Sequence, residues 1–282
     1  MAVKIPEFEP KIRAKPNAEL QISEDILTPL VPQFRKTAGS KEIELKLLVK
    51  PKKGATVIVG FPGFGYVATI ATEYLIDHLK THPLGEIWSS QLTSAAFIHE
   101  GRVIKPIEIF HNDKYNILII EALSNVSGLE WEIAEAVLKL CREISAKELI
   151  CIEGVSAPAA NTEPQAFYYS NNAANSKKLE KIGLKKIRDG VIFGVAGALL
   201  LKAKKDISSS FIFAETHSDL PDSRAAAKVI QVLDQYVNLK VDYAPLLKRA
   251  EEFEKRLQEL IRKAQFAVAA KKEKEVKLPY IG

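Results

Sequence analysis

Apolar runs of strand length alternate with segments of helical spacing through the middle of the chain. The strand-like runs cover residues 43–49, 56–60, 116–121, 148–154 and 209–216, with shorter strands expected at 94–98 and 102–110. The helical segments cover residues 66–80, 127–141 and 221–236. Strands that alternate with helices in this way predict βαβ units. We therefore expect an α/β fold with a mainly parallel sheet sandwiched by helices.

Local signals support the helical assignments. Apolar residues recur at helical spacing from Val67 to Leu75 in the first helix. Ser127 and Glu130 stand at the spacing of a capping box, which marks the start of the second helix. Pro221 lies near the first turn of the last core helix, where a proline is well tolerated.

Composition divides the chain into four segments. Residues 1–40 carry five prolines without sustained periodicity, which predicts an extended N-terminal arm. Residues 41–244 hold the alternating pattern and form the α/β core domain. Residues 245–270 predict an amphipathic helix, and residues 271–282 a mobile C-terminal docking tail.

The predicted C-terminal helix carries a heptad-like seam. Its apolar positions are Leu246, Ala250, Phe253, Leu257, Leu260 and Ala264, and the positions between them are mostly charged. One interpretation is a long helix that pairs with another copy of the chain, with Leu246, Phe253, Leu257 and Leu260 at the oligomer interface. The other is an amphipathic helix that lies on its own domain.

The last residues combine a charged spacer with an apolar tip. Lysines and glutamates fill residues 271–277, so this stretch is expected to be solvated. The tip that follows is Leu278, Pro279, Tyr280, Ile281 and Gly282. A free end gains little from an apolar, aromatic tip unless a partner buries it, and burial of a tyrosine and an isoleucine contributes several kcal/mol. The tip therefore predicts a partner-binding segment.

Composition excludes several classes of protein. The 282 residues are 47% apolar with a net charge of +5, and the basic runs interleave glutamates and lack stacking aromatics, which disfavours nucleic-acid binding. No run approaches the length of a membrane span or of a signal peptide, so we expect a soluble, cytoplasmic protein. The two cysteines, Cys141 and Cys151, are interpreted as reduced core residues.

A glycine-rich turn after the strand 56–60 is the strongest candidate for ligand binding. It contains Gly60, Phe61, Gly63, Phe64 and Gly65, and such a strand-to-helix turn can offer backbone N–H groups to an anion. Its spacing is GxxGxG, which matches neither the dinucleotide fingerprint nor the P-loop. The alternative is that the glycines permit a tight turn and the phenylalanines serve packing or a partner. A second turn at Gly194 and Gly197 could line the same pocket.

The other residues that could act in catalysis or bind a metal do not form a complete site in the sequence. Glu215 lies at the end of the strand 209–216, and His217 begins the loop that follows it. An acid and a base at this place suggest acid–base chemistry in the same possible pocket. The alternative is that the loop only starts the next helix, because Ser218, Asp219 and Asp222 are natural helix caps. His78 and His82 stand one helical turn apart without an apparent third ligand. We expect no catalytic residues, no metal and no cofactor.

Three segments resemble the proteasome assembly chaperone type 2 family, most closely its archaeal branch. They are residues 57–79, 189–203 and 211–257, the last with the order AET, PD, AA and VDY. The resemblance implies a fold similar to that of nucleoside phosphorylases without their catalytic residues. It also implies homo-oligomers that act beside the 20S proteasome independently of ATP.

The resemblance further implies a receptor for the C-terminal tip. Several family members bind the proteasome α subunits through a tail that ends in a hydrophobic residue, a tyrosine and one further residue. Here Tyr280 is third from the end, so either the pocket accepts one extra residue, Ile281 replaces the tyrosine, or the tail binds elsewhere. The expected function is a non-enzymatic proteasome chaperone or activator. The alternatives are a nucleotide- or nucleoside-binding enzyme or sensor that uses the glycine turns, and a scaffold whose helix binds another protein.

Overall fold

The computed structural model describes residues 42–94, 96–99, 101–156, 163–216 and 221–248, together with residues 259, 262 and 263. All of them belong to the unit Ser40–Gly282. The strands are β1 (Glu44–Leu47), β2 (Thr56–Gly60), β3 (His82–Trp88), β4 (Phe97–His99), β5 (Arg102–Ile104), β6 (Ile107–Asn112), β7 (Ile117–Ala122), β8 (Glu148–Ser156), β9 (Ala166–Ser170), β10 (Lys185–Lys186) and β11 (Ser209–Thr216). The helices are α1 (Val67–His78), α2 (Glu130–Glu143), α3 (Ala173–Lys181), α4 (Gly194–Lys202), α5 (Ser223–Val237) and α6 (Ala244–Lys248), with a 3-10 turn η2 (Phe64–Tyr66).

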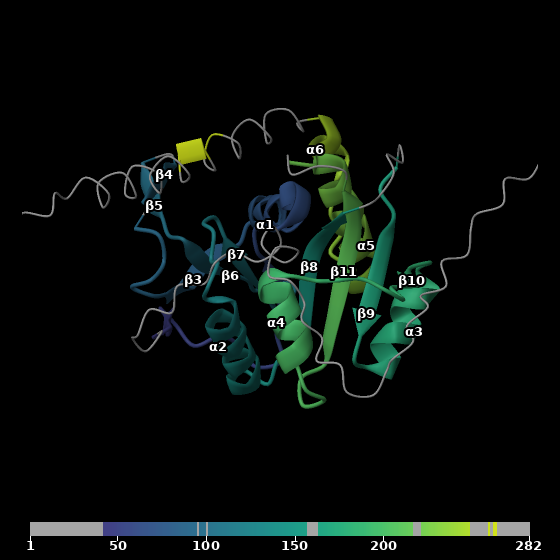
Figure 1. Cartoon of the computed structure of the whole chain (residues 1–282), viewed down its shortest axis with the longest axis horizontal. Coiled ribbons are helices and arrows are strands. Elements are labelled where there is room, and N and C mark those ends of the chain that lie inside the picture. Colours follow the sequence, from purple (N-terminus) through teal and green to yellow (C-terminus); the bar gives the residue numbers. More distant parts are fainter. Residues whose placement is uncertain are drawn as a thin grey trace, which may run out of the picture. The chain divides into compact units, whose positions relative to one another are not determined.

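The main sheet is mixed, with a parallel centre. Its order is β1-β3-β6-β7-β2-β8-β11-β9-β10, and β4 and β5 form a separate hairpin (Figure 1). The central strands β7, β2, β8 and β11 are parallel, whereas β1, β3 and β6 add antiparallel pairs at one side and β9 pairs antiparallel with β11 at the other. The expectation of a mainly parallel sheet therefore holds for the centre and is wrong for the flanks, because a short turn from β6 to β7 suffices for an antiparallel pair.

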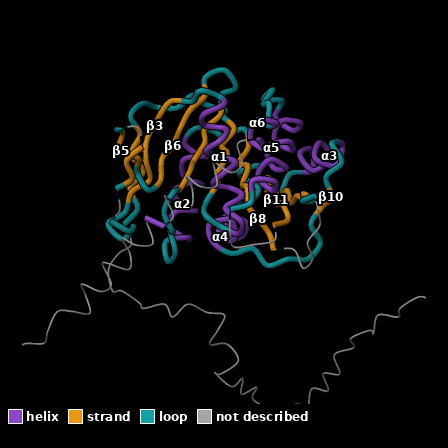
Figure 2. The backbone as a smooth tube through the Cα atoms, turned by 90° about the horizontal axis from the view of Figure 1, so that it is seen from above, coloured by secondary structure: helices purple, strands orange, loops and turns teal. Residues whose placement is uncertain are grey.

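Helices cover both faces of the sheet (Figure 2). On one face α2 packs against α4, and the core beneath them includes Val57, Val59 and Ile133. On the other face α1 packs against α5, over Ile58 and Ile119. Every residue of β2, β6 and β7 is buried, as expected for central strands covered on both sides. The predicted layering of helices around a sheet is confirmed.

The strand β3 was not expected from the sequence. It contains Pro83 and Gly85, and the pairing with β6 shifts register between these two residues. Its burial also lacks a strict alternation. Proline and glycine weaken a strand pattern and belong to edges and bulges, which is why the segment lacks a strand signal of its own. The predicted strand at 102–110 is likewise divided into β5 and β6 around Lys105 and Pro106.

The starts of two helices test the expected caps. The prediction of a capping box at Ser127 and Glu130 is wrong, because Leu129 is the N-cap of α2. The Ser127 hydroxyl donates instead to Asn125, and the Glu130 carboxylate accepts from the Gly128 N–H. Asp222 is the N-cap of α5, as expected. Its Oδ1 accepts hydrogen bonds from two N–H groups in the first turn, and its Oδ2 accepts one from Thr216 at 2.9 Å. One side chain thus joins the end of β11 to the start of α5.

Replacement of Asp222 by alanine should destabilise the fold. The Asp222→Ala variant loses the cap of α5 and the bond to Thr216, and we expect the free energy of unfolding to fall by about 1–2 kcal/mol. Urea denaturation followed by circular dichroism measures this change. The matched control, Asp222→Asn, keeps a capping oxygen and should lose less. An alanine variant that unfolds at the same urea concentration as the parent would contradict the assigned role.

Candidate functional site

The glycine-rich turn lies at the carboxyl end of β2 and leads through η2 into α1. Gly65 and Tyr66 both have positive φ values, 61° and 47°. The Tyr66 N–H donates to the Gly63 carbonyl at 3.1 Å, and the Asp222 N–H donates to the Gly65 carbonyl at 2.8 Å. The turn is therefore closed on itself and fixed to the start of α5.

Neighbouring side chains fill the spaces that the glycines leave open. A Cβ added at Gly63 would collide with the Glu153 carboxyl group, and one at Gly65 would collide with the Thr216 side chain. A Cβ at Gly60 would lie 2.6 Å from Thr72 Cγ2 and 2.8 Å from the Ala68 carbonyl oxygen. These contacts support the interpretation that the glycines serve tight turning and close packing.

The two phenylalanines of the turn differ in their exposure. Phe61 is buried and belongs to the core on the α2 and α4 face. Phe64 is 40% exposed. Of the two, Phe64 is therefore the one that is available to a partner.

Two buried carboxyl groups lie at the same end of the sheet and were not singled out in the sequence. Glu153 is near the end of β8, and burial raises its pKa to about 8. Glu121 is near the end of β7, and burial raises its pKa well above the usual range, with nearby Glu73 adding to the rise. The Thr72 hydroxyl donates to Glu121 at 3.2 Å. Burial therefore favours the protonated, neutral form of both carboxyl groups. In the sequence their only signal is a glutamate that ends each apolar run.

The loop after β11 is only partly described. The Glu215 carboxylate accepts from the Gln165 N–H at 3.3 Å, and the Glu215 N–H donates to the Gln165 carbonyl. This carboxylate is thus used to hold the start of β9. His217 lies outside the described residues, as do Ser218 and Asp219. Acid–base chemistry by Glu215 and His217 remains untested.

The second glycine turn begins a helix. Gly194, with a φ of 68°, is the first residue of α4, and a Cβ at Gly197 would lie 2.5 Å from the Ile192 carbonyl oxygen. Gly197 therefore lets the segment before the helix pack closely on it. Both η2 and α4 contact β8, so the two glycine turns approach the same strand. A shared pocket at this place stays a prediction.

An open groove of about 590 Å³ lies between β1 and α2. Its apolar lining includes Leu45, Leu47 and Trp131, and its charged lining includes Glu135 and Lys202. The last two form an ion pair of 2.9 Å. An apolar floor with a charged rim suits a polypeptide better than a small anion.

The cysteines and histidines are placed by the structure. Cys141 and Cys151 are free and buried, and burial raises the pKa of the Cys141 thiol to about 12, so the prediction of reduced core residues is confirmed. The spacing of His78 and His82 does not place both on one helix, because α1 ends at His78, whose ring stacks on Tyr74. His82 begins β3 and lies instead beside His111 and Asp113, a grouping that could hold a metal ion.

The predicted partner-binding tail and most of the predicted oligomer interface cannot be placed. Leu278, Pro279, Tyr280, Ile281 and Gly282 lie outside the described residues, as do Phe253, Leu257 and Leu260. Leu246 belongs to α6. Among the charged positions of the heptad segment, Glu259, Arg262 and Lys263 are helical and exposed. Within the described part of the chain, no helix is both long and apolar enough to cross a membrane.

The fold and the sequence together define the family. Residues 57–261 match the model of the PAC2 family, and the chain belongs to that family. The protein MJ0106 of Methanocaldococcus jannaschii, which is uncharacterized, is 28% identical over 208 residues, covering 72% of this chain and 84% of the relative.

Solved structures extend the comparison. PbaA of Pyrococcus furiosus, an archaeal homolog of proteasome-assembly chaperone, is 29% identical with a TM-score of 0.73, over 80% of this chain and 99% of PbaA. PbaB of the same organism, an archaeal proteasome activator, is 23% identical with a TM-score of 0.66, over 78% of this chain and 99% of PbaB. At that identity PbaB supports the fold alone.

The buried acid Glu153 should make stability depend on pH. Its pKa is raised from 4.5 to about 8 by burial, so the folded protein binds this proton more tightly than the unfolded chain does. The contribution of this proton to the free energy of unfolding is fully present below the unfolded pKa of 4.5 and is lost as the pH rises to about 8. Over that range the free energy of unfolding falls by at most about 1.4 kcal/mol per pH unit.

The variant Glu153→Gln removes this titration while it keeps the size of the side chain. We expect its unfolding free energy to fall less steeply than that of the parent between about pH 5 and pH 8. Urea denaturation at several pH values gives both slopes. Glu143→Gln, which changes an exposed carboxylate on α2, should keep the parental slope. Equal slopes in the parent and in Glu153→Gln would show that Glu153 does not hold its proton more tightly in the folded state.

Proposed function

We propose that this protein is a non-enzymatic, ATP-independent chaperone or activator that binds the α-ring of an archaeal 20S proteasome. The observation that carries the proposal is the family match over residues 57–261 together with the likeness to PbaA across nearly its full length. PbaA is an archaeal homolog of proteasome-assembly chaperone, and the chain also shares its fold with PbaB, an archaeal proteasome activator.

The C-terminal tip is the proposed contact with the α subunits. Leu278, Tyr280 and Ile281 offer apolar side chains in the last residues of the sequence, and the preceding lysine and glutamate residues would supply a solvated spacer. Burial of the tyrosine and isoleucine would provide most of the binding free energy of one tail. A single short tail of this kind binds weakly.

Several tails on one assembly would bind much more tightly than one. In our proposal the chain forms a homo-oligomer through the heptad seam at Leu246, Phe253, Leu257 and Leu260. The tails of such an oligomer face the ring together, and each bound tail raises the effective concentration of the next. This arrangement gives a role to the helix that precedes the tail.

The contacts of the described residues argue against the competing enzyme hypothesis. The spaces beside Gly63 and Gly65 are filled by Glu153 and Thr216, so the turn does not present an open cradle for a phosphate. The Glu215 carboxylate is held by the backbone of Gln165. A fold shared with enzymes does not establish activity.

Deletion of the tip should abolish binding to the proteasome. We expect a chain that lacks residues 278–282 to lose at least about tenfold in affinity for archaeal 20S particles, because the apolar contacts are gone. A pull-down of 20S and a peptide-hydrolysis assay measure binding and gate opening separately. A truncated chain that binds and activates as the parent does would refute tail docking.

Two further variants test the register of docking. Removal of Gly282 alone places Tyr280 second from the end, and it should strengthen binding if the receptor reads that spacing. Ile281→Ala should weaken binding strongly only if Ile281 occupies the tyrosine pocket. The matched control, Lys277→Ala, changes the spacer and should leave the affinity within about twofold at moderate salt.

A further inference from the structure

We propose that His82, His111 and Asp113 form a binding site for one divalent transition-metal ion of the zinc class. The three side chains come from the start of β3, the end of β6 and the turn that follows β6. Each offers one ligand atom, and these atoms all lie within 4.8 Å of one another. Two imidazoles and one carboxylate are a donor set that suits Zn²⁺ and related ions.

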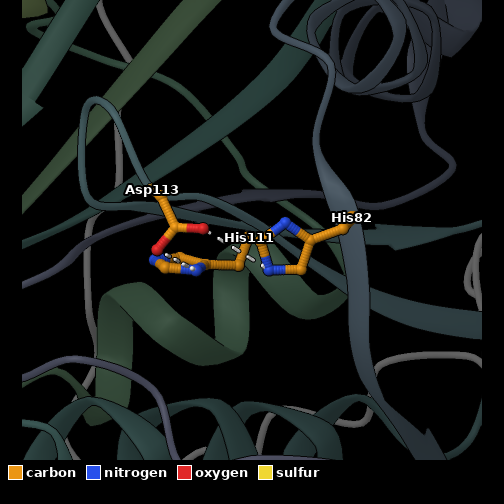
Figure 3. Close-up of side chains that lie close together, drawn as sticks. All are labelled: His82, His111 and Asp113. Carbon is orange, nitrogen blue, oxygen red and sulfur yellow. Dashed lines mark ion pairs between the residues drawn. The ribbon is translucent and has the colours of Figure 1, made fainter.

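The pairing of two strands brings the ligands together. His82 and His111 are directly opposite each other in the antiparallel pair of β3 and β6, and their rings are 5.4 Å apart in an edge-on arrangement. Both rings approach the carboxylate of Asp113, which lies two residues after His111 (Figure 3). His111 Nδ1 is 3.7 Å from one carboxylate oxygen, and His82 Nε2 is 3.8 Å from the other.

These distances fit a site that is nearly formed. Bonds of about 2.0–2.1 Å in a tetrahedral geometry place neighbouring ligand atoms roughly 3.3–3.4 Å apart. The two separations given above exceed that spacing by a few tenths of an ångström but run to different oxygens of Asp113, and the full set of three ligand atoms lies within 4.8 Å, so the side chains must turn to close around one ion. Small rotations of the exposed His82 and Asp113 side chains, which are 50% and 59% exposed, close the difference. Three protein ligands leave a fourth position for water.

A hydrogen bond prepares His111 for coordination. The Asn116 amide nitrogen donates to the Lys53 carbonyl at 3.2 Å, which turns the Asn116 carbonyl oxygen toward His111 Nε2 at 3.5 Å. That oxygen can only accept, so in the neutral ring a hydrogen bond here places the proton on Nε2 and leaves the lone pair on Nδ1. The free Nδ1 is the atom that faces Asp113. A second partner that sets the tautomer in this way is typical of histidine ligands to metals.

The turn that carries Asp113 is also held in place. The Asn112 side chain donates to the Leu79 carbonyl at 2.7 Å and accepts from the Tyr115 N–H at 2.9 Å. His111 itself is only 5% exposed, so its ring has little freedom. One ligand is thus fixed in the sheet, and the two exposed ligands can adjust to an ion.

Lys52 is the competitor for the site. Its ammonium group lies 2.9 Å from Asp113 Oδ1, and both side chains are more than half exposed. An exposed ion pair contributes little to stability, so a divalent ion can replace the ammonium at this oxygen. Lys52 therefore sets the affinity of the site.

The position of the site indicates a structural role. It lies at the amino-terminal end of β2 and β7, at the opposite end of the central strands from the glycine turn. A bound ion would tie β3 to β6 where the register of that pair shifts near Pro83 and Gly85. We therefore expect the ion to stabilise the antiparallel side of the sheet.

Metal titration of the full, untagged chain tests the proposal. After treatment with a chelator, the protein is titrated with Zn²⁺ by calorimetry and with Co²⁺ by visible absorption. We expect one ion per chain, Co²⁺ bands of a low-coordinate nitrogen and oxygen site, and a rise in the melting temperature with Zn²⁺. Absence of saturable binding, or of any shift in melting temperature, would overturn the proposal.

Variants at the exposed ligands locate the site without disturbing the core. His82→Gln and Asp113→Asn should each weaken Zn²⁺ binding by about 100-fold or more, since the loss of a ligand exceeds the loss of a supporting contact. Lys52→Met should strengthen it roughly fivefold by removing the competitor. The control His78→Gln, an exposed histidine stacked on Tyr74, should bind as the parent does. If His82→Gln and Asp113→Asn bind with the parental affinity, the ion lies elsewhere and the assignment is wrong.

Discussion

The burial of the central parallel strands on both faces is the constraint on which the rest of the structure depends. Every residue of β2 and β7 is buried, and α1 with α5 on one side and α2 with α4 on the other leave no open face. Near the ends of these strands a glycine, Gly60, leaves room for α1, and burial raises the pKa of the Glu121 and Glu153 carboxyl groups, which favours their neutral form.

The sequence predicts the buried centre well and the edges poorly. The bounds of β2 and β11 agree with the predicted strands, because long apolar runs are decisive wherever both faces are covered. The strand β3 was missed, because Pro83 and Gly85 break its pattern and only its partner β6 stabilises it. Similarity to nucleoside phosphorylases remains a prediction that no comparison tests.

The candidate sites follow the same division. Asp222 was predicted as a cap from its local context, since its partners are two and three residues away in the chain or at the end of β11. The grouping of His82, His111 and Asp113 depends on a strand pairing that joins residues almost thirty positions apart. A local pattern cannot reveal such a register, and in the sequence the nearest histidine to His82 is His78, four residues before it.

The edge strand β1 has a consequence for how copies of this protein meet. Among the described strands it pairs only with β3, and no other described strand pairs with its outer side. It is only four residues long, and Glu44 and Lys46 form an exposed ion pair along it. Short length and charge are the features by which natural sheets discourage edge-to-edge aggregation. At this end of the sheet, the protein is thus protected against uncontrolled strand addition.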